Sequence, residues 1–174
     1  MTANTFKLIE TPCLLNADVC DTELLQLLSV STSGERKMPE KKIKFTIHGK
    51  VVGKGRPHFV KKTGVAITPE RTRSYESIIR DAAHREMKWE PWDVPVAAVI
   101  TAYYEIPKSW AKAKKEMARR QLIAPGKPDT DNIVKIVLDS CNRVVYLDDS
   151  QVVLCVARKL WGDTARLVVT LQEA

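Results

Sequence analysis

No stretch of this 174-residue sequence stays apolar for long. A helix needs about 18 consecutive apolar residues to span a bilayer, and no run approaches that length. Residues 1–20 also lack the basic start and unbroken apolar segment of a secretory signal, since Lys7 is soon followed by Glu10. We therefore expect no membrane span, no signal peptide and a cytoplasmic location.

Cysteine is scarce, with Cys13, Cys20, Cys141 and Cys155 scattered singly along the chain. None belongs to a Cys-x-x-Cys pair, and the three histidines are dispersed, so zinc-ligand spacing is missing. A cytosolic chain should keep such thiols reduced. The segment Gly53–Gly55 lacks the frame of a phosphate-binding P-loop, and we expect no organic cofactor.

Positive charge is concentrated in the larger part of the chain. The net charge is +7, whereas residues 1–40 hold three basic and six acidic side chains, a net of −3. The remaining residues therefore carry +7 − (−3) = +10. A basic body of this kind attracts polyanions, most commonly DNA or RNA, although many basic domains bind neither.

Composition changes near residue 40. Residues 31–42 are polar and include Gly34 and Pro39, which predicts a linker. We therefore divide the chain into an extension of unknown role, residues 1–40, and one domain, residues 41–174. Met38 lies just before the first expected strand, and we hypothesise that translation can begin there. Intact-mass measurement of the native protein tests this, and a mass matching Met1 would end the idea.

Hydrophobic periodicity in residues 41–174 predicts the order β-α-β-α-α-β-β. This order favours an α/β (α+β-like) fold, a single compact domain with a mixed sheet and flanking helices. Thr68 is the expected cap of the first helix, and the last two strands are expected to form a hairpin at Gly162-Asp163. The expected elements are a strand at 43–52, a helix after Pro69 with Ile78 in its buried face, a strand at 95–106, helices at 109–122 and from Asp131, and strands at 151–160 and 165–171.

Polar residues form one face of the helix that begins near Asp131. At about 100° per residue, Asp131, Lys135, Asp139 and Asn142 fall together, opposite the apolar side chains. The simplest interpretation is a solvated face with i,i+4 ion pairs.

Two acidic pairs favour a different interpretation. Asp129 and Asp131 occur together where one capping acid suffices, and Asp148-Asp149 precedes a strand, where aspartate is disfavoured. Converging carboxylates suit Mg²⁺ or Mn²⁺. A calcium-binding loop does not fit, because Val134 occupies the position of its glycine.

The motif around these acids resembles a known family. It is Lys127-Pro128-Asp129-x-Asp131-Asn132-x-x-Lys135-x-x-x-Asp139, followed by Asp148-Asp149-x-Gln151. Together with the upstream Gly-Lys-Gly-Arg-Pro segment and the Thr68-Pro69 helix start, it is similar to RusA-type Holliday junction resolvases, many of them carried by phages and prophages. The resemblance covers residues 41–174. It implies a homodimeric, Mg²⁺-dependent endodeoxyribonuclease, with Mn²⁺ able to substitute, that cuts four-way junctions by paired nicks during DNA recombination and repair.

The resemblance also implies residue roles. The metal-binding and catalytic aspartates of the family match Asp129, Asp131 and Asp149, and its catalytic lysine matches Lys135. Asp148 has two open roles: a further metal contact, or shaping of the turn. Other matched positions are expected to hold the metal-binding residues in place or to have a purely structural role: Asn132, Asp139 and Gln151.

Two basic segments are candidates for DNA binding. The first is the loop after the first strand, with Phe59 as a wedge at the crossover, and the second is the arginine face of the following helix. A solvated loop and a solvated helix face are the alternatives. The candidate residues are Lys54, Arg56, His58, Lys61, Lys62, Arg71 and Arg73.

Three other functions remain open at this stage. One is a nuclease of the same fold that prefers other branched or flapped DNA. The second is a branched-DNA-binding protein without catalysis, in which the acids bind metal structurally. The third is an interaction protein that binds neither DNA nor metal. A comparison of DNA substrates, with and without Mg²⁺, distinguishes them.

Overall fold

The computed structural model describes residues 41–59 and 66–174, which form a mixed sheet with helices. The sheet contains β1 (Lys42–His48), β4 (Val96–Glu105), β5 (Val152–Gly162) and β6 (Arg166–Glu173), in the order β1-β6-β4-β5. β6 is antiparallel to both β1 and β4, whereas β4 and β5 are parallel. This mixed sheet confirms the predicted α/β class. No helix within these described ranges is long and apolar enough to cross a membrane.

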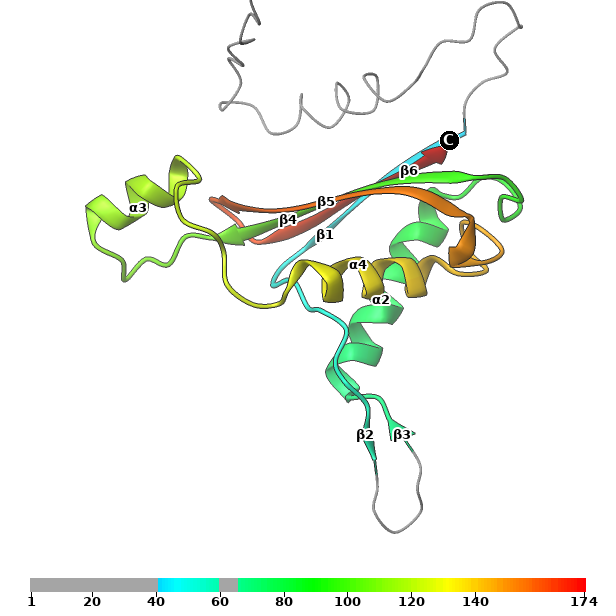
Figure 1. Cartoon of the computed structure of the whole chain (residues 1–174), viewed down its shortest axis with the longest axis horizontal. Coiled ribbons are helices and arrows are strands. Elements are labelled where there is room, and N and C mark those ends of the chain that lie inside the picture. Colours follow the sequence, from blue (N-terminus) through cyan, green and yellow to red (C-terminus); the bar gives the residue numbers. More distant parts are fainter. Residues whose placement is uncertain (1–40, 60–65) are drawn as a thin grey trace, which may run out of the picture. The chain divides into compact units, whose positions relative to one another are not determined.

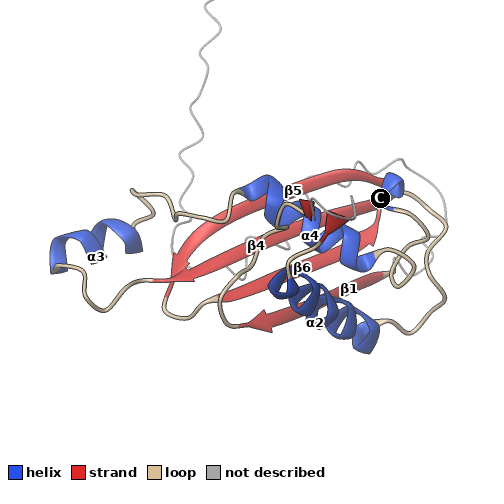
Figure 2. Cartoon of the chain, turned by 90° about the horizontal axis from the view of Figure 1, so that it is seen from below, coloured by secondary structure: helices blue, strands red, loops and turns tan. Residues whose placement is uncertain are grey.

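The expected hairpin between the last two strands is wrong, because β4 lies between them (Figure 2). β4 is buried over nearly its whole length, which suits the interior of a sheet rather than an edge. The chain passes from β5 to β6 beyond the end of β4. Gly162 lies close to β4 there, and a Cβ on it would be 3.3 Å from the Tyr103 ring.

Two helices cover one face of the sheet (Figure 1). They are α2 (Glu70–Glu86) and α4 (Thr130–Cys141), which contact each other as well as the strands. Every second residue of β1 points into this core, in agreement with the predicted alternation. The buried residues of the helices include Tyr75, Ile79, Ala82 and Ala83 from α2 and Ile133, Ile136, Val137 and Cys141 from α4.

α2 differs from the expectation at two positions. Its N-cap is Pro69 rather than Thr68, and the Pro69 carbonyl accepts hydrogen bonds from the backbone N–H groups of Thr72 and Arg73. Ile78, predicted to be buried, is 48% exposed, whereas Thr72 is buried. The threonine is buried because its hydroxyl accepts a backbone hydrogen bond from Gly55.

The segment before α4 carries a short helix, α3 (Lys112–Arg119), attached to the end of β5. Trp110 packs edge-on against Trp161 with ring centroids 5.1 Å apart, and the side chain of Gln121 makes two hydrogen bonds to the Trp161 backbone. α3 is shorter than the expected helix over 109–122. Gln121 ends it with a φ of 56°, in the left-handed region.

Candidate active site at the start of α4

The start of α4 lies beyond the ends of the parallel strands β4 and β5. Polar groups from both strands hold the preceding segment, because the Lys159 ammonium donates to the Pro128 carbonyl at 3.2 Å and the Tyr104 hydroxyl donates to the same oxygen at 3.5 Å. Lys159 also donates to the Gly126 carbonyl at 2.8 Å. The carboxyl ends of parallel strands are a common location for ligand sites in α/β folds.

Asp129 is the N-cap of α4, but its side chain accepts no capping hydrogen bond. Asp131, in the first turn, is exposed, and Asn132 donates to it at 3.4 Å. Both carboxylates lie at the N-terminal, positive end of the helix macrodipole. The two predicted acids therefore lie together at the start of α4, and neither side chain caps the helix.

Lys135 is exposed one helical turn after Asp131. The face predicted for α4 thus contains both the acids and the lysine of the motif. Tyr104, which the sequence pattern did not single out, lies near Asp129. Burial and the negative charge of Asp129 raise the pKa of Tyr104 to about 12, so its hydroxyl stays protonated at neutral pH. The signal that was available is its position at the end of a central strand.

The segment Gly53-Lys54-Gly55 packs between α2 and α4. The Lys54 backbone N–H donates to the Asn132 carbonyl at 2.8 Å. A Cβ on Gly53 would lie 2.7 Å from Pro128 Cβ, and one on Gly55 would lie 2.7 Å from the Thr72 hydroxyl. Both distances are shorter than real Cβ atoms show, so only glycine permits this approach.

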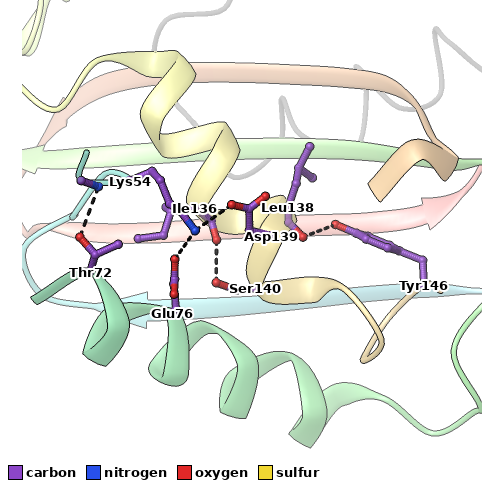
Figure 3. A network of polar contacts seen from close by, with 9 residues as sticks. Lys54, Thr72, Glu76, Ile136, Leu138, Asp139, Ser140 and Tyr146 are labelled. Atoms are coloured by element: carbon purple, nitrogen blue, oxygen red, sulfur yellow. Dashed lines mark hydrogen bonds and ion pairs between the residues drawn. The ribbon is translucent and has the colours of Figure 1, made fainter. Parts of the chain in front are cut away.

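Lys54 lies between two carboxylates rather than in solvent (Figure 3). Its ammonium is 2.5 Å from Glu76 of α2 and 2.8 Å from Asp139 of α4, and its side chain is 24% exposed. Burial alone would lower the pKa of Lys54, but the two hydrogen-bonded carboxylates raise it above its ordinary value. Lys54 and Asp139, predicted for DNA binding and for support of the site, are therefore paired with each other.

A groove of about 770 Å³ runs beside the start of α4. Among the described residues that line it, five are basic and Asp129 is the sole acid, so the groove suits an anion such as a DNA phosphate. Asn132 also lines it. The basic residues are Lys50, Lys54, Arg56, Arg71 and Lys127.

The remaining DNA-binding candidates lie elsewhere or cannot be placed. Arg73 is exposed on α2 but does not line the groove. His58 belongs to β2 (His58–Phe59), which pairs with β3 (Ala66–Ile67) in a short ribbon, and the described part of the chain excludes the side chains of both β2 residues. Lys61 and Lys62 lie outside the described residues.

The second acidic pair lies in the turn after α4. Asp148 caps the short 3-10 helix η1 (Asp149–Gln151): it accepts from the Ser150 N–H at 2.9 Å, and its own N–H donates to Gln151. The hydrogen bonds from Ser150 lower the pKa of Asp148. Gln151 donates to the carbonyls of Trp92 and Val94, so it ties this turn to the start of β4. Asp149 is exposed.

The third predicted ligand, Asp149, does not join the other two within one chain. η1 contacts the C-terminal end of α4. Gln151 is held beside the start of β4, and Asn142, which follows α4, forms an isolated β-bridge with Tyr146. A rise of 1.5 Å per residue puts Asn142 about 16 Å from Asp131 along the helix axis. Accordingly, the described residues contain no group of three or more Asp, Glu, His or Cys side chains able to hold one metal ion.

Comparison with known proteins assigns the chain to a family. The model of the family described as "Endodeoxyribonuclease RusA" matches residues 48–172, most of the sequence. The chain therefore belongs to the RusA endodeoxyribonuclease family, which confirms the resemblance noted in the sequence. It is also 34% identical over 136 residues to "Uncharacterized protein YqaN" of Bacillus subtilis (strain 168), an alignment that covers 75% of this chain and 96% of the relative.

Proposed function

We propose that this protein is a structure-selective endodeoxyribonuclease that resolves Holliday junctions by paired nicks in DNA recombination and repair. One observation carries the proposal: the start of α4 presents Asp129 to a groove lined by five basic side chains. Cations able to bind phosphates and a carboxylate line the same groove, an arrangement suited to phosphodiester hydrolysis. Membership of an endodeoxyribonuclease family supports the same assignment. We propose a cytoplasmic location, which would give the protein access to such a DNA substrate.

The chain's own residues have distinct proposed roles. Arg56 and Arg71 bind phosphates from the loop and from α2, since both line the groove and neither forms an ion pair with a residue in the described ranges, as Lys54 does. Lys135 places a cation one turn from Asp131 and stabilises negative charge that develops on the phosphate. Tyr104 and Lys159 fix the backbone of the segment from which Asp129 projects. Asn132 orients Asp131.

We propose Mg²⁺, with Mn²⁺ as a substitute, as the cofactor, with Asp129 and Asp131 as its ligands from this chain. Asp129 and Asp131 would hold the ion, which would supply polarisation of the scissile phosphate and a lowered pKa of bound water. The donor set fits in part: two free carboxylates lie together, but Asp149 is separated from them by the length of α4. Residues 41–174 would form the catalytic domain, and residues 1–40 an extension whose role stays open.

A cleavage assay tests the function. Purified protein is incubated with a synthetic four-way junction or a linear duplex, with Mg²⁺ or EDTA, beside the Asp131→Asn variant. We expect symmetric nicks in the junction alone, lost with EDTA and in the variant. Tight junction binding without nicks in Mg²⁺ or Mn²⁺ would instead identify a non-catalytic branched-DNA-binding protein. Preferential cutting of flaps or other branches would identify a nuclease of different specificity.

A further inference from the structure

We propose that the α3 arm, residues 108–127, binds the phosphate backbone of a duplex as that duplex leaves the groove beside α4. The inference rests on the proposed function, because the bound duplex is an arm of the same junction. It adds a second surface to the groove, one that recognises DNA by charge and not by branching or base sequence.

The α3 arm carries a strong excess of positive charge. Residues 108–127 contain seven basic side chains and one acidic side chain, a net of +6, in a chain whose total is +7. All of the basic residues except Lys115 are exposed. A surface of this charge attracts polyanions, and each phosphate that it neutralises releases counterions from DNA. The basic residues are Lys108, Lys112, Lys114, Lys115, Arg119, Arg120 and Lys127.

The charges of α3 do not stabilise the helix that carries them. Its first turn contains Lys112, Lys114 and Lys115 and no acid, at the end where the macrodipole is positive. Its N-cap, Ala111, supplies no side-chain cap. Lys112 and Lys115 are also three residues apart, a spacing at which like charges repel. A sequence that breaks local rules without a gain inside the chain points to a function, and here the charge points to an anionic partner.

Trp161 of β5 holds the arm in place. The Trp110 ring packs against it with ring centroids 5.1 Å apart, and the Trp161 indole N–H donates to the Ile123 carbonyl at 2.7 Å. The side chain of Gln121 makes two hydrogen bonds to the Trp161 backbone, each of 2.9 Å. The cations therefore project from a fixed frame, so little backbone freedom is lost when they bind a ligand.

The arm and the start of α4 are attached to the same end of β5. Trp161 follows Lys159 by two residues, so both side chains lie on one face of the strand. Lys159 holds the segment that leads to Asp129, as Trp161 holds the arm. Figure 1 and Figure 2 both show α3 projecting past the end of the sheet at which α4 begins. Lys127, at the end of the arm, itself lines the groove, so a duplex that leaves the groove past this end of the sheet meets the arm.

The outward side of α3 presents cations that are available to a ligand. At about 100° per residue, Lys112 and Arg120 lie away from the buried side of the helix. Among residues 41–59 and 66–174, Lys108 and Lys112 have no ion-pair partner. Arg119 and Arg120 share Glu116, at 4.0 Å and 3.0 Å, and all three side chains are more than half exposed. Ion pairs this exposed contribute little, so both guanidinium groups can bind a phosphate instead.

A binding titration without metal tests the proposal. Fluorescence anisotropy in EDTA gives the affinity for a four-way junction and for a linear duplex over a range of salt concentrations, for wild type and for Lys108→Gln/Lys112→Gln. We expect the affinity in about 0.1 M salt to fall at least about 10-fold. The slope of log K against log salt should become shallower by about 2, because each lost phosphate contact removes about 0.9. Both DNAs should lose affinity equally, since the arm recognises charge alone.

Two further variants control for total charge and for the side chains themselves. Lys44→Gln/Lys88→Gln removes the same charge at two exposed positions, on β1 and after α2, and should bind DNA as the wild type does. Lys108→Arg/Lys112→Arg keeps the charge of the arm and should keep the affinity. Single-turnover cleavage at saturating protein should be unchanged in all three variants, because the arm touches no reacting atom.

The outcomes separate the arm from the nuclease function. Equal affinity and slope in Lys108→Gln/Lys112→Gln and in Lys44→Gln/Lys88→Gln, with wild-type binding intact, would overturn the proposal and leave the nuclease function standing. A loss of junction binding alone would also overturn it, because the arm would then recognise the branch. Weaker binding of both DNAs by the arm variant, together with no cleavage by the wild type in Mg²⁺, would support the arm and refute the nuclease. A wild type that binds neither DNA would refute both.

Discussion

The two acidic pairs that flank α4 differ in what holds their backbone. At the start of the helix, residues from other elements hold the backbone. Lys159 and Tyr104 donate hydrogen bonds to the Pro128 carbonyl, and the Lys54 backbone N–H donates to the Asn132 carbonyl. Asp129 and Asp131 are left without capping duties. After the helix, Asp148 caps its own turn. The difference teaches that an aspartate whose backbone is held by others is available for chemistry, whereas one that holds its own turn is structural.

The largest expected effect separates Asp148 from the aspartates that are proposed or expected to bind the metal. We expect Asp131→Asn to reduce junction cleavage at least about 100-fold, since a metal ligand is lost, while thermal stability stays unchanged at this exposed site. Asp149→Asn should match it. Asp148→Ala should retain most of the cleavage. Initial rates on the four-way junction measure all three, and equal losses in Asp148→Ala and Asp131→Asn would abolish the distinction.

Lys135 extends the comparison along the exposed face of α4. We expect Lys135→Met to lower the cleavage rate about 100-fold with little change in junction affinity, because the cation acts on charge that develops during the reaction. Single-turnover kinetics and gel-shift titration measure the two quantities. Lys88→Met, at an exposed position after α2, is the control. A weaker complex with an unchanged rate would make Lys135 a phosphate contact instead.

A substitution at Gly53 tests whether the position of Asp129 and Asp131 depends on the loop that packs against the start of α4. We expect Gly53→Ala to lower the free energy of unfolding by about 1–3 kcal/mol, because the new methyl group overlaps Pro128 and Asn132. Cleavage should fall as the start of α4 moves. Gly126→Ala is the matched control, since nothing lies within 4 Å of a Cβ there. Urea titration of both variants measures stability, and equal midpoints would show that the loop packs loosely.

Lys54 joins the loop to both helices, and its loss should leave two carboxylates without their cation. We expect Lys54→Met to destabilise the protein by about 2 kcal/mol, as for hydrogen bonds to charged groups. The raised pKa means that this contribution is complete at neutral pH and is lost only as pH rises above 10.5. Lys50→Met, at an exposed position, should have little effect on stability in the same urea titration. An unchanged midpoint in Lys54→Met would mean that the two ion pairs contribute nothing.

The smallest effect concerns the second pair alone. We expect Asp148→Ala to lower the melting temperature slightly at neutral pH, because the Ser150 N–H loses its acceptor. The pKa of Asp148 is lowered from 3.8, so the stabilisation is present above that pH and disappears as pH falls below it. Melting curves of both proteins should therefore converge in acid. A difference that persists at low pH would point to a loss independent of the charge.

The sequence predicted the fold class, and family comparison supports the identity of the motif, but neither predicted the arrangement of the site. The periodicity of β4 and α4 is local, so it was detectable. The position of β5 beside β4 depends on pairing between distant strands, which local patterns do not encode, and the hairpin expectation failed there. Lys54 appeared to be a phosphate-binding loop residue because its partners, Glu76 and Asp139, lie far away in sequence.

The separation of Asp149 from Asp131 had the same origin. The helical wheel places residues around an axis and ignores their distance along it. The expectation that both acidic pairs converge therefore ignored the distance along the helix axis, which separates them. The prediction for Ile78 failed for a related reason: the buried width of α2 is set by what packs against it, and Ile78 lies outside that width at 48% exposure.

The attachment of the basic loop to both helices would link the proposed DNA binding to folding. If Arg56 and Arg71 bind phosphates as proposed, the bound phosphates would favour the native arrangement of α2 and α4, because Lys54 connects the loop to both helices. A ligand that binds only the folded state shifts the unfolding equilibrium by mass action, by about 2.7 kcal/mol at 100 times its dissociation constant. Junction DNA in EDTA should therefore protect the core amides of α2 and α4 from hydrogen exchange, although it touches neither core.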